Sequence, residues 1–121
     1  MTHEITIFHN PNCSKSRKTL ELLKENDVEP SIVTYLTEPP VAESILRLAG
    51  LLELKVEDLL RKGEDDVKSA TDLPPLHDES ALADWMHRHP KTLQRPIVVD
   101  ERNDRAVIGR PPENVLELLK K

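Results

Sequence analysis

The sequence is poor in several residue types, and each shortage narrows what the chain can do. It has one cysteine, Cys13, so it cannot form an internal disulfide. Aromatic residues make up 2% of the 121 residues, so the core must consist mainly of Leu, Ile and Val. No apolar run is long enough to cross a bilayer, and the first residues run into a short apolar segment without the pattern of a signal peptide. We therefore expect a cytoplasmic protein that does not associate with membranes.

Positive charge is also in short supply. Lys and Arg number 17 against 22 Asp and Glu, for a formal net charge of −5. Nonspecific nucleic-acid binding depends on Lys and Arg that neutralise phosphates, so we expect no nucleic-acid partner, although a local basic cluster can still bind a small anion. The three glycines form no phosphate-binding loop. His87 and His89 have no evident third partner, so no metal site is expected.

The first third of the chain predicts a βαβ unit. Residues 5–8 and 31–35 are short, β-branched segments typical of strands. Between them, apolar or small residues recur every three or four positions over 13–23, which predicts a helix that ends near Asn26. Two strands joined by one helix over so short a length are expected to lie parallel.

The rest of the chain predicts a helical insert and then a hairpin with a final helix. The insert spans about residues 40–90 and includes a leucine-rich helix that carries Arg61 and ends near Gly63. Strands at 96–99 and 106–108 form the hairpin. The resulting fold class is α/β: one thioredoxin-like domain over 1–121, with a βαβ–ββα order, a mixed four-stranded sheet and a helical insertion.

Cys13 stands where the first helix begins, directly after a loop. Free backbone N–H groups and the helix dipole favour a thiolate there, and Lys15 and Arg17 add positive charge. A lone cysteine is more often an inert, buried side chain, but these surroundings lower a thiol pKa and make the sulfur nucleophilic. Ser14 and Ser16 either cap the helix or donate their hydroxyls to the sulfur or to a bound oxyanion.

The spacing around Cys13 excludes two familiar chemistries. A dithiol motif needs a second cysteine three residues later, where Ser16 stands. A cysteine-phosphatase loop needs an arginine six residues later, where Thr19 stands. Any redox turnover must therefore use an external thiol.

The segment 9–17, His-Asn-Pro-Asn-Cys-Ser-Lys-Ser-Arg, closely resembles the His-x-x-x-Cys-x-x-x-Arg signature of the glutaredoxin-dependent arsenate reductases. Segments 59–62, 94–99 and 108–113 look like the other blocks of that family, in the same order. The resemblance covers essentially the whole chain and implies a redox-active cysteine enzyme of the thioredoxin-like superfamily that serves arsenic detoxification.

This resemblance implies roles for particular residues. Cys13 attacks arsenate or a similar oxyanion, which Arg61, Arg95 and Arg110 bind. Glutathione is implied as a co-substrate, with no bound cofactor, and glutaredoxin as the partner that completes the reduction to arsenite. We expect a monomer. A supporting set tunes the cysteine, holds its loop or carries a cis peptide bond after Arg95. Those residues are His9, Asn10, Ser16, Arg17 and Pro96. For Arg17, the sequence leaves two roles open: support of the loop or contact with the substrate.

Strand order supports part of this assignment independently. If the first hairpin strand lies antiparallel to 5–8, then Cys13, Arg95 and Arg110 share one rim of the sheet. Guanidinium groups there can grip a tetrahedral oxyanion through paired N–H donors. Arg61 reaches the rim only if the insert folds back over it.

Two other functions stay open. The chain could be a thioredoxin-like thiol reductase, or a glutathionylated redox sensor, with a different target. It could also be a non-enzymatic transcriptional regulator that binds RNA polymerase. Such regulators usually carry a Cys-x-x-Cys switch, and Ser16 replaces the second cysteine here.

Overall fold

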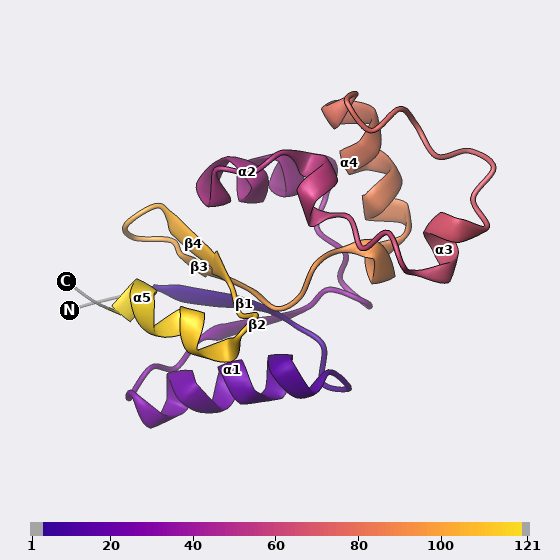
Figure 1. Cartoon of the computed structure of the whole chain (residues 1–121). Helices are drawn as coiled ribbons and strands as arrows, with labels where there is room; N and C mark the ends of the chain where they lie inside the picture. The colour runs from indigo at the N-terminus through magenta and orange to yellow at the C-terminus, as the bar shows by residue number, and fades with distance from the viewer. Residues whose placement is uncertain (1–3, 120–121) are drawn as a thin grey trace. The chain divides into compact units, whose positions relative to one another are not determined.

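The computed structural model describes residues 4–119 and divides the chain into two compact units (Figure 1). The sheet unit joins the residues up to Tyr35 to those from Arg95 onward, and the helical unit is residues 36–94. The predicted insert at about 40–90 falls within the helical unit. The first three residues, which bear on the expectation of no signal peptide, lie outside the described part. Within 4–119, no helix is both long and apolar enough to span a membrane.

The sheet unit is built on four strands in the order β2-β1-β3-β4. β1 pairs in parallel with β2 and antiparallel with β3, and β3 pairs antiparallel with β4. The expected mixed α/β sheet is therefore confirmed. The strands are β1 (Ile5–His9), β2 (Ser31–Thr34), β3 (Ile97–Asp100) and β4 (Arg105–Ile108).

The register brings four strand ends to one rim of this sheet. His9 at the end of β1 pairs with Thr34 at the end of β2. Phe8 pairs with Ile97 at the start of β3, and Ile97 pairs in turn with Ile108 at the end of β4. The segments that leave these ends therefore begin side by side, as the strand-order argument predicts.

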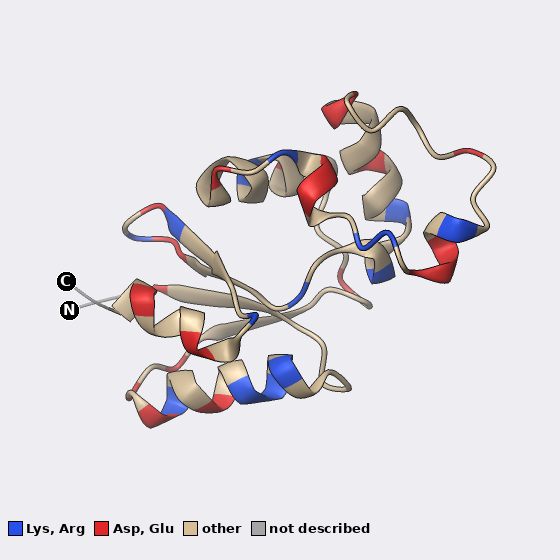
Figure 2. Cartoon of the chain, in the orientation of Figure 1, with Lys and Arg blue, Asp and Glu red and all other residues tan. Residues whose placement is uncertain are grey.

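One face of the sheet is covered by α1 (Ser14–Glu25), the 3-10 helix η3 (Pro112–Val115) and α5 (Leu116–Leu119) (Figure 1). The apolar core forms there because alternate strand residues meet the apolar stripes of these helices. Its buried members are Ile5, Ile7, Leu23, Val98, Val115 and Leu118. Basic residues are concentrated on the N-terminal half of α1, next to the rim (Figure 2).

The helical unit packs α2, α4 and the 3-10 helix η1 together around a second set of buried apolar residues. Asp78 caps α4 by accepting from the Ala81 N–H at 3.2 Å. The leucine-rich helix is shorter than expected, because Leu60 is extended and forms a bridge with Leu93. Arg61 therefore lies beyond the helix and not on it. The elements are α2 (Ala42–Leu52), η1 (Val56–Leu59), α3 (Asp65–Lys68), α4 (Glu79–Arg88) and η2 (Pro90–Thr92).

Candidate functional site

Cys13 is held at the junction between the rim loop and α1. It is the N-cap residue of α1, with extended backbone angles of φ −101° and ψ 122°. Its N–H donates to the Asn10 carbonyl at 3.0 Å, and its own carbonyl accepts from the Arg17 N–H at 3.0 Å. The side chain is partly buried, so the thiol keeps some access to solvent. The backbone thus fixes the sulfur over the free N–H groups of the first helical turn.

The surroundings of Cys13 favour its thiolate. Burial opposes ionisation, but the backbone N–H groups of Ser16 and Lys15 and the Arg95 side chain outweigh it, so the pKa of the Cys13 thiol is lowered. Hydrogen bonds and a positive charge that meet the ionised form are what stabilise it. A partly exposed thiol with a lowered pKa is the setting of a nucleophilic cysteine.

Ser16 holds the loop before Cys13 through buried hydrogen bonds. Its side chain is buried, and its Oγ lies 2.6 Å from His9 Nδ1 and accepts from the Asn10 N–H at 3.0 Å. Burial, followed by the positive charges of Arg17 and Lys24, lowers the pKa of His9, so its ring is neutral at neutral pH. Because Ser16 Oγ already accepts one N–H, its hydroxyl proton is free to donate to His9 Nδ1.

The loop itself is closed by two further hydrogen bonds. Asn10 Oδ1 accepts from the Asn12 N–H at 2.9 Å. Arg17 Nη1 donates to the Pro11 carbonyl at 2.8 Å. Of the two roles that the sequence leaves open for Arg17, this contact corresponds to support of the loop.

Arg95 lies beside Cys13 at the rim, and Arg110 contacts Arg95. The Arg95 side chain lies close enough to the Cys13 sulfur to lower the pKa of that thiol. Arg110 Nε donates to the Arg95 carbonyl at 2.8 Å, which ties the two arginines together. The Arg95–Pro96 peptide bond is cis, as expected, and so is the Arg110–Pro111 bond, which the sequence analysis did not anticipate.

Gly109 allows the end of β4 to approach α1 closely. A Cβ at this position would lie 2.5 Å from Thr19 Oγ1 and 2.8 Å from Pro96 Cγ. The Asn114 side chain also donates to the Arg110 carbonyl at 3.2 Å. These contacts determine where Arg110 leaves the sheet.

Tyr35 is a rim residue that the sequence analysis did not single out. It follows β2 directly and is buried, and its hydroxyl lies against the Arg95 guanidinium and the Asn10 side chain. Burial raises the pKa of Tyr35, although both neighbours act in the opposite direction. The predicted topology could have identified Tyr35, because a strand parallel to β1 must end at the same rim as β1, and Tyr35 directly follows that strand.

Arg61 belongs to the helical unit. Its N–H donates to the Thr92 carbonyl at 2.7 Å, and its Nε lies 3.7 Å from Glu64 Oε2. Its role in oxyanion binding stays a prediction.

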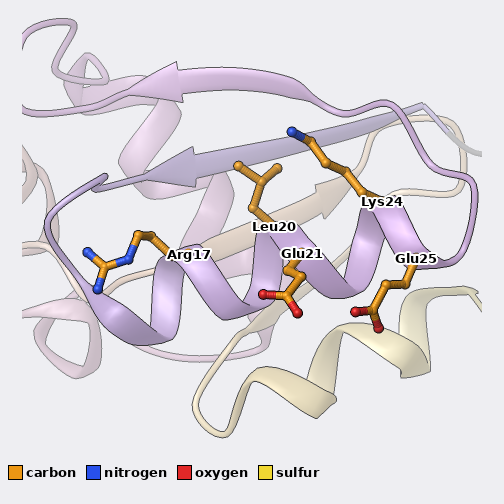
Figure 3. Close-up of a pocket in the computed structure, with 5 residues that line it drawn as sticks. All are labelled: Arg17, Leu20, Glu21, Lys24 and Glu25. Carbon is orange, nitrogen blue, oxygen red and sulfur yellow. The ribbon is translucent and has the colours of Figure 1, made fainter.

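The remaining candidate sites have structural explanations. Within residues 4–119, no group of three or more His, Cys, Asp or Glu is arranged to hold a metal ion. His87 Nδ1 lies 2.9 Å from the Pro40 carbonyl oxygen, and His89 stacks on Trp85 with ring centroids 4.1 Å apart. A hollow of about 430 Å³ runs along α1, and Cys13 is not part of its lining (Figure 3). That lining consists of Arg17, Leu20, Glu21, Lys24 and Glu25.

Comparison with known proteins agrees with this arrangement. The model of the ArsC family matches residues 8–118. The chain belongs to the ArsC family. The uncharacterized protein YfgD of Escherichia coli is 46% identical to it, over 98% of this chain and 99% of its own length. An arsenate reductase of Neisseria meningitidis is 38% identical, over 96% of this chain and 98% of its own.

The fold of this ArsC-family chain is also found in solved structures. The structure of an arsenate reductase from Vibrio cholerae superposes with a TM-score of 0.84 at 39% identity. The superposition covers 97% of this chain and 98% of the other. The thioredoxin-like, four-stranded fold is thus shown by the strands themselves and by this likeness.

Proposed function

We propose that this ArsC-family protein is an arsenate reductase whose nucleophile is Cys13. The observation that carries the proposal is the Cys13 thiolate site itself, a helix N-cap thiol with a lowered pKa beside the Arg95 guanidinium. Arg110, fixed to the Arg95 carbonyl, brings a second guanidinium to the same rim. The arsenate reductases among its relatives support arsenate as the oxyanion.

In the first step, the Cys13 sulfur uses an electron pair to form a bond to arsenic. A hydroxyl group of the hydrogen arsenate ion takes up one proton and leaves as water. Arg95 and Arg110 neutralise the remaining oxygens, which lowers the repulsion between the thiolate and its anionic substrate. Bidentate N–H donors suit the tetrahedral oxyanion geometrically.

Reduction then requires thiols from outside the chain, since Cys13 is its single cysteine. In the proposed sequence, a glutathione thiol displaces a second oxygen as water and bonds to arsenic. A glutaredoxin thiolate attacks the glutathione sulfur and forms a mixed disulfide, while the electron pair of the sulfur–arsenic bond passes to arsenic and yields As(III). Water then releases arsenite and regenerates the Cys13 thiol. A reducing compartment such as the cytoplasm supplies these thiols.

The test is a coupled assay with glutathione, glutathione reductase, glutaredoxin and NADPH. We expect NADPH oxidation that depends on arsenate and on glutaredoxin, and that is abolished in Cys13→Ser because the nucleophile is lost. Ser80→Ala is the matched control, since it removes a hydroxyl from an exposed residue of α4 in the helical unit and should keep the turnover. Absence of an arsenate-dependent rate with every coupling component present contradicts the assignment.

A second candidate function is supported by the partial exposure of Cys13. An accessible thiolate can form a mixed disulfide with glutathione without any arsenical, as a redox sensor or a general thiol reductase does. Mass spectrometry after treatment with oxidised glutathione measures this adduct. An adduct in a protein that is inactive towards arsenate favours this second function.

A further inference from the structure

Tyr35 places a fully buried phenol at the rim beside Arg95. Among the residues that the structure describes, neither the Tyr35 hydroxyl oxygen nor Arg95 Nε has a partner at strict hydrogen-bond geometry, and both atoms are shielded from solvent. The phenol and the guanidinium nevertheless lie close enough for each to affect the ionisation of the other. Burying a polar group without a hydrogen-bond partner costs free energy, so a buried phenol beside a guanidinium requires an explanation.

The groups around the Tyr35 hydroxyl determine whether its oxygen accepts or donates hydrogen bonds. A guanidinium has only donors. The Asn10 side chain lowers the pKa of Tyr35, which is the effect of a donor, so its amide nitrogen faces the phenol while its oxygen accepts from the Asn12 N–H at 2.9 Å. The Tyr35 oxygen is therefore the acceptor that lies between the loop of Cys13 and Arg95.

The backbone at Arg95 is fixed from the other side. Its carbonyl accepts from Arg110 Nε at 2.8 Å, and the cis peptide bond to Pro96 follows it. These contacts hold the main chain, but they do not by themselves fix the position of the guanidinium at the end of the long side chain. An acceptor near the guanidinium restricts that rotation and so reduces the entropy lost when Arg95 meets an anion.

We propose that Tyr35 is a positioning residue, whose hydroxyl oxygen holds the Arg95 guanidinium against the Cys13 sulfur and the incoming oxyanion. Tyr35 acts through Arg95 and does not itself touch the substrate. The part that concerns the oxyanion rests on the proposed arsenate reductase function. The part that concerns the thiolate does not, because it depends only on Tyr35, Arg95 and Cys13.

The test uses Tyr35→Phe, which keeps the ring and removes the oxygen. Because the chain has one cysteine, the rate of alkylation by iodoacetamide as a function of pH reports the pKa of Cys13 alone. We expect that pKa to rise by about half a unit, so that alkylation slows about threefold at any pH well below the pKa. Arg95→Ala should raise it by about one unit.

A double-mutant cycle distinguishes positioning from general damage. If Tyr35 acts through Arg95, adding Tyr35→Phe to Arg95→Ala produces no further rise in the Cys13 pKa. Additive shifts overturn the proposal, and so does an unchanged pKa in Tyr35→Phe. The matched control is Val98→Ala, a substitution in the buried core that lowers thermal stability. The proposal is equally overturned if Val98→Ala raises the thiol pKa as much as Tyr35→Phe does.

Arsenate kinetics extend the test to the oxyanion. Tyr35→Phe should lower kcat/KM for arsenate by about tenfold, chiefly through KM, because Arg95 is less well oriented to bind the anion. A fall in kcat alone contradicts this part. If the wild-type protein shows no arsenate turnover, the proposed function fails, while the thiol pKa measurements still decide the role of Tyr35.

Discussion

The sheet unit and the helical unit use their polar side chains differently. In the sheet unit, buried polar groups converge on one thiol: Ser16 joins His9 to the backbone of Asn10, and Arg95 faces Cys13. In the helical unit, polar contacts tie irregular segments to helices. Those contacts include Trp85 with Asp72, His89 with Asp66 and His87 with Pro40.

This difference is also visible in what is buried. Among the described residues of the helical unit, Thr92 is the one buried polar residue. Its hydroxyl donates to the nearby His89 carbonyl at 2.6 Å. The sheet unit buries His9, Asn10, Ser16 and Thr19 at its rim side, and Asp100 at the opposite end of β3. Burying polar groups costs free energy. A cluster of such groups beside a reactive atom is therefore typical of a functional site, where the chemistry requires them despite their cost to stability.

The largest effect is expected from the arginines, and it tests whether oxyanion binding belongs to the sheet unit alone. Arg95→Ala should lower kcat/KM for arsenate by roughly 100- to 1,000-fold, because a charged donor to the substrate is lost. The coupled NADPH assay measures this loss. The matched variant is Arg61→Ala in the helical unit. By the family match, its turnover should also fall, whereas wild-type turnover in Arg61→Ala would restrict oxyanion binding to the sheet unit.

The next largest effect is expected from a glycine substitution in the sheet unit, compared with one in the helical unit. Gly109→Ala should destabilise the protein by about 1–3 kcal/mol, since the new methyl group overlaps Thr19 and Pro96. Thr19 cannot turn away freely, because its hydroxyl donates to the Lys15 carbonyl at 2.8 Å. Urea unfolding measures the change, and arsenate turnover should fall as Arg110 shifts.

The control for that substitution lies in the helical unit. A Cβ at Gly50, within α2, meets nothing within 4 Å. Gly50→Ala should therefore stabilise the protein by about 0.5–1 kcal/mol through helix propensity, with turnover unchanged. Equal effects of the two substitutions on stability would contradict the close packing described for Gly109.

A smaller effect is expected at Asp72, where a polar contact is only structural. Its carboxylate accepts from the indole N–H of Trp85 at 3.0 Å. Asp72→Ala should lower Tm by about 3 °C and leave the alkylation rate of Cys13 unchanged. Asp84→Ala is the matched control, because it removes a similarly exposed carboxylate that also contacts Arg88 but leaves the indole bond intact. A changed alkylation rate in Asp72→Ala would show that the helical unit affects the thiol.

Much of the sheet unit follows from local patterns. Breaker residues before Cys13 and the apolar spacing after it determine where α1 begins, and strand order then places Arg95 and Arg110 at the rim. Tyr35 escaped notice because an aromatic residue at the end of a strand has the pattern of a core residue, and only its neighbours reveal a polar role. The early end of the helix before Arg61 depends on the pairing of Leu60 with a segment distant in sequence, which periodicity cannot detect.

The smallest effect is expected from pH, and it concerns the buried histidine of the sheet unit. Because the pKa of His9 is lowered in the folded protein, the unfolded chain takes up a proton first as pH falls. The stability present above the ordinary histidine pKa of about 6.5 is therefore lost as pH falls through the lowered value. Urea midpoints between pH 7.5 and 5 measure this loss. The slope of stability against pH should flatten in His9→Gln. His77→Gln changes an exposed residue of the helical unit and should keep the wild-type slope. If His9→Gln keeps that slope as well, the acid sensitivity comes from other groups, and the contact between neutral His9 and Ser16 is not what stabilises the rim loop.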